Sequence, residues 1–299
     1  MSTAELTATP DGHALAGGER APGSVRQWTR LLGSELRLVF RRWRNLALLA
    51  VLVVLPVVLG IGLKVAGPNG GGGGGPDATF FAQLAGNGVF LAFIALTILL
   101  TLVLPLVMAV VSGDSLAGEA GAGTLRYLLT VPAGRTRLLT VKYTSVVIFG
   151  LVSSLLVTAV SLVMGMILFP VGPVTLLSGT TVSLAVGLVH LLYVALYVAA
   201  AMAALGAIGL AISSLTEHPI GAIAAILVLA VASEVADQVS QFAVIHPYLP
   251  THFWLSFDSL LRSPIDTTDL LHGLLSFAVY IVIFWLLAWA RFTSADVTS

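Results

Sequence analysis

The stretch from Gly118 to Leu139, GEAGAGTLRYLLTVPAGRTRLL, places Glu119 and several arginines between two long apolar runs. Charged side chains in such a position can form ion pairs with a partner protein. Arginines in a loop between membrane spans can instead act only as signals that set the orientation of the chain. The residue types alone leave both roles open for Arg126, Arg135 and Arg137.

The same stretch predicts a short helix with one apolar side. Thr124 follows two glycines and can cap the helix, while Pro132 and Gly134 end it. The apolar side consists of Leu125, Leu128 and Leu129. A stripe of this size needs a surface to pack on, which is either another protein or an amphipathic helix of this chain.

Three ionisable residues inside predicted spans form a second candidate site. Glu234 and Asp237 are three residues apart and therefore share a face of a helix, and His190 lies in the preceding span. They can line an outward cavity that favours cationic substrates. Alternatively, the span ends early and leaves both acids in water, and His190 forms a hydrogen bond between helices.

No catalytic site and no metal site is predicted. His246, His252 and Asp258 match no known spacing of metal ligands, and the chain has no cysteine to form a disulfide or bind a metal. The six glycines at 70–75 lack the Lys and Ser/Thr that a phosphate-binding loop requires. The sequence also contains no GxxxxGK(S/T), LSGGQ-like, GxSxG or HExxH motif that could serve ATP hydrolysis or membrane-enzyme chemistry.

These residues belong to a chain with the composition of an integral membrane protein. Of its 299 residues, 58% are hydrophobic and 9% are charged, whereas soluble domains have roughly 25% charged residues. A helix needs about 20 apolar residues to cross a bilayer. The sequence therefore predicts an all-α membrane protein with six transmembrane helices, at residues 46–65, 89–111, 144–168, 182–213, 219–240 and 270–290.

The segments that flank the spans have compositions of their own. Residues 24–44 carry Trp, Leu and Val at every third or fourth position and arginines on the opposite side, which predicts an amphipathic helix in the headgroup layer. Residues 1–23 are small and polar and are predicted to be a disordered cytoplasmic tail. The transmembrane domain is expected over 45–291, with a second cytoplasmic tail at 292–299.

The distribution of cations predicts the orientation in the membrane. Seven arginines precede the first span, four Lys or Arg residues lie between the second and third, and one follows the sixth, so 12 of 14 lie on one side. Cytoplasmic segments carry the excess of Lys and Arg. Both termini and residues 118–139 are therefore predicted to be cytoplasmic, in a multi-pass protein of the bacterial cell membrane, with Lys64 and Arg262 outside.

The residue pattern over 113–143 resembles the loop between the second and third spans of type-two ABC transporter permeases. These permeases are the membrane subunits of ATP-driven exporters. The matching positions are Asp114, Glu119, Gly123-Thr124-Leu125, Leu128-Leu129, Pro132, Arg135 and Lys142. The likeness covers most of the chain and includes the entry helix, the six spans, the SSLTEHP turn at 213–219 and LPTHFW at 249–254. The chain departs from the family at Ala120, where a basic residue is frequent, and at Gly134, where serine is frequent.

The resemblance implies that residues 118–139 contain a coupling helix that docks in a cytoplasmic ATPase. The implied coupling residues are Glu119, Gly123, Thr124, Leu125, Arg126, Leu128, Leu129, Pro132 and Arg135. Since the chain has no ATPase motif, it is expected to be no enzyme by itself and to hold no cofactor, with ATP and Mg on two copies of a separate ATPase chain.

The resemblance also implies a second permease chain, as a homodimer, and export of drug-like, antibiotic or lipid-like amphipathic molecules between the permease halves. No nucleic-acid partner is expected. Two other classes are an ion-coupled secondary transporter and an intramembrane enzyme. The sequence shows no internal repeat typical of the first and no catalytic motif typical of the second.

Overall fold

The computed structural model describes residues 24–66, 87–123, 134–175, 178–262 and 267–294, with only the backbone described at 24–27 and 175. Within these residues, six helices are long and apolar enough to cross a membrane. They are α2 (Trp43–Ala66), α5 (Val103–Gly121), α7 (Arg135–Leu168), α8 (Leu184–Ser213), α9 (Pro219–Asp237) and α10 (Thr267–Ser294). The chain is an all-α, multi-pass membrane protein, which confirms the predicted fold class.

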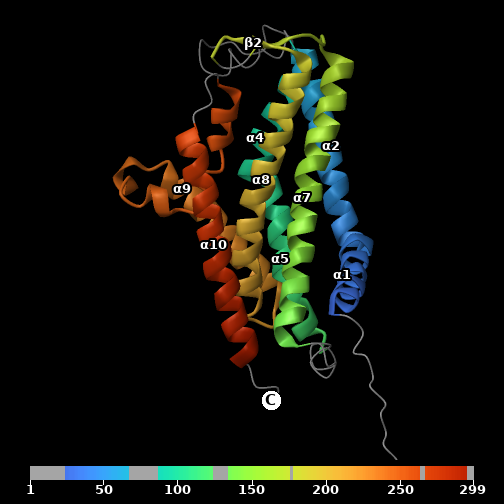
Figure 1. Ribbon diagram of the computed structural model, residues 1–299, viewed down its shortest axis with the longest axis vertical. Helices are drawn as coiled ribbons and strands as arrows, with labels where there is room; N and C mark the ends of the chain where they lie inside the picture. Colours follow the sequence, from blue (N-terminus) through green and yellow to red (C-terminus); the bar gives the residue numbers. More distant parts are fainter. Residues whose placement is uncertain (1–23, 67–86, 124–133, 176–177, 263–266, 295–299) are drawn as a thin grey trace, which may run out of the picture.

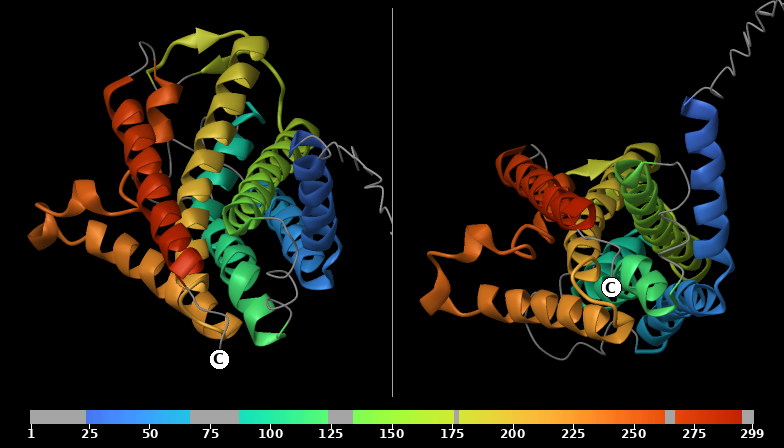
Figure 2. Two further views of the ribbon diagram at one scale, coloured as in Figure 1. Left: turned by 60° about the horizontal axis from the view of Figure 1, so that its bottom comes forward. Right: turned by 90° about the horizontal axis from the view of Figure 1, so that it is seen from below.

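The amphipathic helix α1 (Ser24–Arg41) lies at one end of the bundle. In the view from below, α1 is seen lengthwise while α7 is foreshortened, so α1 runs across the bundle axis (Figure 2). Its apolar side packs against α7, with the rings of Phe40 and Phe149 5.2 Å apart. The helix ends at Arg41 instead of Arg44, because the chain bends at Arg42 and α2 begins at Trp43.

The predicted span at 89–111 is wrong in its bounds, because the structure divides this region into two helices. A short apolar helix, α4 (Phe90–Thr101), is followed by α5, and Leu102 between them has non-helical dihedral angles. Pro105 contributes to the break, because its ring clashes with the carbonyl group four residues earlier, that of Thr101. Helix α5 then continues ten residues beyond the predicted end, to Gly121.

The remaining boundaries differ from the predicted ones by smaller amounts. Helix α7 begins at Arg135, nine residues before the predicted third span, and α9 ends at Asp237, three residues before the predicted end of the fifth. The helix α10 extends over 267–294 and includes part of the predicted C-terminal tail. The predicted tail at 1–23 lies outside the described residues.

The connections at the other end of the bundle contain little regular structure. Strands β1 (Val174–Thr175) and β2 (Thr181–Val182) pair antiparallel and join α7 to α8. Three short 3-10 helices follow α9, in a connection that projects sideways from the bundle (Figure 1): η1 (Ser240–Phe242), η2 (His246–Tyr248) and η3 (Ser256–Leu261). We call the end of the bundle where β1 and β2 lie the β1–β2 end, and the opposite end, where α1 lies, the α1 end (Figure 1).

Helix α8 forms the centre of the bundle and contacts α5, α7 and α10. Small residues of α8 face these neighbours and allow close helix packing. A Cβ atom at Gly206 would lie 2.7 Å from Val146 Cγ1, and one at Gly209 would lie 1.9 Å from Ser112 Oγ. Glycine at these positions therefore sets how closely α8 approaches α7 and α5.

Candidate functional site

Six charged residues gather at the α1 end, where α1, α2, α5 and α7 meet. We call them the elbow cluster: Glu35, Arg42, Arg44, Asp114, Glu119 and Lys142. Three are acids and three are bases, so the cluster has no formal net charge. Its α5 and α7 members lie on the two helices that lead into and out of residues 124–133, which contain the predicted coupling helix.

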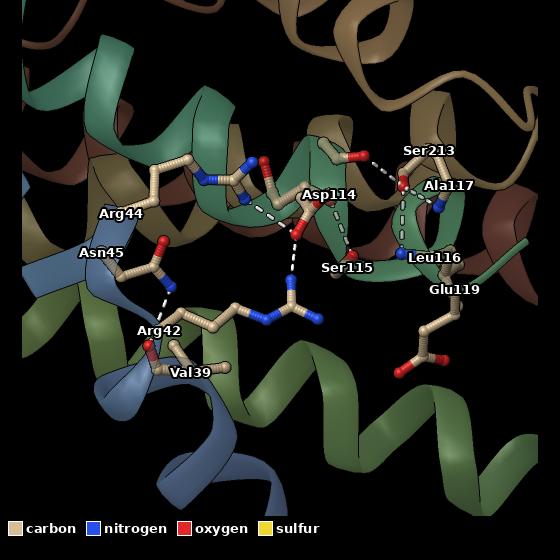
Figure 3. Close-up of polar contacts among 12 residues, drawn as sticks. Val39, Arg42, Arg44, Asn45, Asp114, Ser115, Leu116, Ala117, Glu119 and Ser213 are labelled. Carbon is tan, nitrogen blue, oxygen red and sulfur yellow. Dashed lines mark hydrogen bonds and ion pairs between the residues drawn. The ribbon is translucent and has the colours of Figure 1, made fainter. Parts of the chain in front are cut away.

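Asp114 joins α5 to the bend between α1 and α2. Its carboxylate pairs with the guanidinium groups of Arg42 and of Arg44, the latter at 2.8 Å (Figure 3). On a continuous helix, residues two positions apart would point about 200° apart. The bend at Arg42 removes this constraint, so that both arginines reach the same buried carboxylate.

Lys142 joins α7 to both α5 and α1. Its side chain is 3% exposed, and its Nζ lies 2.5 Å from Glu119 Oε1 and 3.4 Å from Glu35 Oε1. A buried ammonium group requires such partners, because leaving water without them carries a large free-energy cost. Three helices are therefore held together by one lysine.

The cluster encloses a small cavity of about 40 Å³. A single water needs roughly 10–15 Å³ by this measure, so the cavity has room for a few waters and is too small for an organic substrate. Asn45 lines it, and its buried Oδ1 has no hydrogen-bond partner among the described residues, while its Nδ2 donates to the carbonyl group of Val39 at 2.9 Å.

Ser213 joins the end of α8 to the same part of α5. Its hydroxyl group donates to the Gly113 carbonyl oxygen at 2.7 Å and accepts from the backbone N–H groups of Leu116 and Ala117 at 3.1 and 2.9 Å (Figure 3). The last two turns of α5 are thus bonded to the bend at Arg42, to α2, to α7 and to α8. Displacing this end of α5 would disturb each of these contacts.

The predicted coupling residues are only partly within the described chain. Thr124, Leu125, Arg126, Leu128, Leu129 and Pro132 lie outside the described residues. Gly123 follows the end of α5 with φ of 68°, a left-handed conformation that favours glycine and stops a helix. Glu119 precedes it and binds Lys142.

Arg135, at the start of α7, binds the end of α10. Its guanidinium group donates to the Thr293 carbonyl oxygen at 2.9 Å, and the neighbouring Thr136 Oγ1 accepts from Trp289 Nε1 at 2.9 Å. Both sides of the 124–133 segment are therefore attached to other spans.

Sequence reasoning did not identify the elbow cluster as a unit. The sequence singles out Asp114 only through the family resemblance and Lys142 only through that resemblance and the cation count, and it does not single out Glu35. Arg44 is predicted on the basic side of the amphipathic helix, and Arg42 is counted only among the cations that set the orientation. One signal was present in the sequence: Asp114 and Lys142 lie among apolar residues, where an ionisable group requires a partner.

The ionisable residues toward the β1–β2 end do not form one site. Asp237 Oδ1 lies 2.6 Å from His252 Nδ1 and 3.9 Å from His246 Nδ1, which connects the end of α9 to the segment that follows it. Glu234 is half-buried one turn earlier. His190 Nδ1 lies 2.8 Å from the Val186 carbonyl oxygen of its own helix, and no hydrogen bond or ion pair among the described residues joins His190 to either acid.

Of the three possible metal ligands, His246 and His252 lie near each other, with ring centroids 6.0 Å apart. Asp258 pairs with Arg262 at 3.3 Å, away from the histidines. Among the described residues there is no group of three or more His, Cys, Asp or Glu side chains that could hold a metal ion.

A larger hollow of about 410 Å³ lies between α8, η3 and α10. Its lining is almost wholly apolar and consists of Tyr193, Leu196, Tyr197, Leu260, Thr267, Leu270 and Leu274. Its volume is within the range of sites that bind drug-sized molecules.

Comparison with known proteins assigns the chain to a family. No curated protein matches the chain significantly. A family model described as a protein of unknown function (DUF2705) matches residues 77–298, which is well over half of the chain and includes α4 through the end of α10. This multi-pass membrane protein therefore belongs to the DUF2705 family of proteins of unknown function.

Proposed function

We propose that this chain is the permease subunit of an ATP-driven ABC exporter. It forms the substrate pathway and receives mechanical work from a separate ATPase chain that docks on residues 124–133 from the cytoplasm. The resemblance at Asp114, Glu119, Gly123, Arg135 and Lys142 suggests this role, and the charge distribution favours a cytoplasmic location for the docking segment.

The elbow cluster is the observation that carries the proposal. The two arms of the docking segment, α5 and α7, are bound directly to each other through Glu119 and Lys142, and to α1 through Glu35. Moving one arm away from the other would break the ion pair between Glu119 and Lys142. Each charge would then be left buried without its partner, which carries a large free-energy cost. The arms and α1 therefore move as a unit, which is the property a coupling element needs.

ATP and Mg bind to the partner in this proposal. The chain itself has no nucleotide-binding motif, so two copies of an ATPase subunit assemble with two copies of the permease. Closure of the ATPase dimer tilts the paired arms and opens the pathway outward.

The apolar hollow between α8 and α10 supports amphipathic substrates. It offers about 410 Å³ with almost no polar lining. Glu234 and Asp237 lie at the end of α9, where they favour a positively charged group. Drug-like, antibiotic or lipid-like molecules with an amine fit these features.

Co-purification with a candidate ATPase tests the proposal. Leu128→Asp places a charge on the predicted docking stripe and is expected to abolish complex recovery without impairing membrane insertion. Leu255→Asp is the matched control, because Leu255 is an exposed leucine in the α9–α10 connection. Equal recovery of the complex from both variants would contradict the docking assignment.

Reconstitution distinguishes the other classes. Substrate flux from the purified permease alone in liposomes, driven by an ion gradient, would favour a secondary transporter. Turnover of a lipid or peptide without an ATPase would favour an intramembrane enzyme. The exporter proposal instead expects ATP-dependent flux only when the ATPase is present.

A further inference from the structure

The outward side of α1 carries three aligned arginines. At about 100° per residue, Arg30, Arg37 and Arg41 fall within an arc of about 40°, and all three are exposed. The opposite side of the helix, which includes Val39, packs against the bundle. The arginines therefore point away from the bundle and toward whatever surrounds the protein.

These arginines differ from the two at the bend that follows them. Arg42 and Arg44 share the carboxylate of Asp114, whereas Arg30, Arg37 and Arg41 form no ion pair within the described part of the chain. The acid of α1, Glu35, is on the packed side and binds Lys142. Three positive charges on this side thus remain without an internal counter-charge among the described residues.

The position of α1 places this charge at the depth of the lipid headgroups. The helix lies across the bundle axis (Figure 2), and the apolar span α2 begins within two residues of its end. Leu38 and Trp43 are 57% and 81% exposed beside the arginines. Exposed Leu and Trp next to arginines are typical of a helix whose apolar groups enter the acyl layer while its cations reach phosphates.

We propose that the Arg30–Arg37–Arg41 side of α1 is a binding site for anionic phospholipids of the adjacent leaflet. Each guanidinium group donates paired hydrogen bonds to a phosphate group. An anionic headgroup keeps the negative charge of its phosphate, whereas a zwitterionic headgroup offsets that charge with a cationic amine. Each arginine near an anionic membrane surface strengthens binding roughly fivefold. The site does not depend on the exporter role, because it uses none of the coupling residues.

Native mass spectrometry of the full chain tests this proposal. The protein is purified in detergent with equal amounts of phosphatidylglycerol and phosphatidylcholine, and the bound lipids are counted. The wild type is expected to retain phosphatidylglycerol preferentially. The triple variant R30Q/R37Q/R41Q is expected to reduce that preference by about tenfold or more, and raised salt is expected to weaken it.

Two further variants keep the result interpretable. K64Q/R262Q/R291Q removes the same charge at other exposed positions and is expected to change the preference less than about twofold. R30K/R37K/R41K keeps the charge and is expected to retain most of the preference. An equal loss in K64Q/R262Q/R291Q would show a bulk-charge effect and overturn the proposal.

A wild type that shows no preference for phosphatidylglycerol would also overturn the lipid-site proposal. That result is expected if an acidic partner protein or residues 1–23 cover the arginines instead. ATPase recruitment by R30Q/R37Q/R41Q is measured in parallel. Loss of lipid preference with recruitment intact supports the lipid site, and loss of recruitment with lipid preference intact assigns this side of α1 to the ATPase and refutes the lipid site.

Discussion

Replacing Lys142 by methionine removes the cation that lies between Glu35 and Glu119 while keeping most of the side-chain volume. Lys142 is 3% exposed and each carboxylate is 15% exposed, so solvent screens the cluster weakly. Removing one partner of a buried ion pair costs about 3–5 kcal/mol. We take about 3 kcal/mol, because the adjacent cavity can admit water to the two remaining carboxylates.

The assay is thermal unfolding of the purified protein in detergent, followed by size-exclusion fluorescence. For a chain of this size, 1 kcal/mol corresponds to roughly 2–4 °C, so Lys142→Met is expected to lower the apparent midpoint by roughly 6–12 °C. Lys64→Met is the matched control. Lys64 is exposed near the Phe169 ring, and its loss is expected to cost less than about 1 kcal/mol.

A double-mutant cycle isolates the pair itself. Glu119→Gln leaves Lys142 with Glu35 at 3.4 Å and is expected to cost about 1–2 kcal/mol. The combination of Glu119→Gln and Lys142→Met is expected to cost less than the sum of the single changes, by about 1 kcal/mol or more. If Lys142→Met unfolds at the same temperature as Lys64→Met, or if the two changes are additive, the elbow cluster does not hold the arms together.

Three further changes test other parts of the structure by the same unfolding assay or by labelling. Arg42→Gln is expected to cost less than about 1 kcal/mol, because its side chain is about half exposed and Arg44 remains on Asp114; a loss as large as that of Lys142→Met would contradict this assignment. Gly165→Ala is expected to cost about 1–3 kcal/mol, since its Cβ would lie 2.0 Å from the Gly88 carbonyl oxygen, whereas Gly33→Ala has nothing within 4 Å and is expected to be neutral or stabilising. In this cysteine-free chain, a membrane-impermeant maleimide on intact cells is expected to label Ser178→Cys but not Ser294→Cys, and the reverse result would invert the proposed orientation.

The sequence by itself determined the membrane class and the approximate spans. Apolar length is a local property, so the hydrocarbon thickness can be compared directly with runs of residues. The amphipathic pattern of α1 and the small residues of α8 are local in the same sense, since helical periodicity fixes which side chains share a face. These features required no knowledge of which helices are neighbours.

The effect of each proline required the structure. Pro56 lies inside an unbroken α2, whereas Pro105 is preceded by the break at Leu102. Both residues remove one backbone donor, so the local chemistry is the same. Each proline leaves one carbonyl group without its helical hydrogen-bond donor. Neighbouring helices and local changes in backbone geometry determine whether the helix continues past that carbonyl group or ends there.

The tertiary structure alone identified the ion-pair partners. Arg42 and Asp114 are 72 residues apart, and Lys142 and Glu35 are 107 residues apart, so no spacing rule connects them. The positive-inside count assigns all arginines near the first span the same role. Packing separates them, because Arg42 and Arg44 meet a buried carboxylate while Arg30, Arg37 and Arg41 point outward. Local pattern thus places charges on helices, and only the docking of those helices determines which charges are buried together.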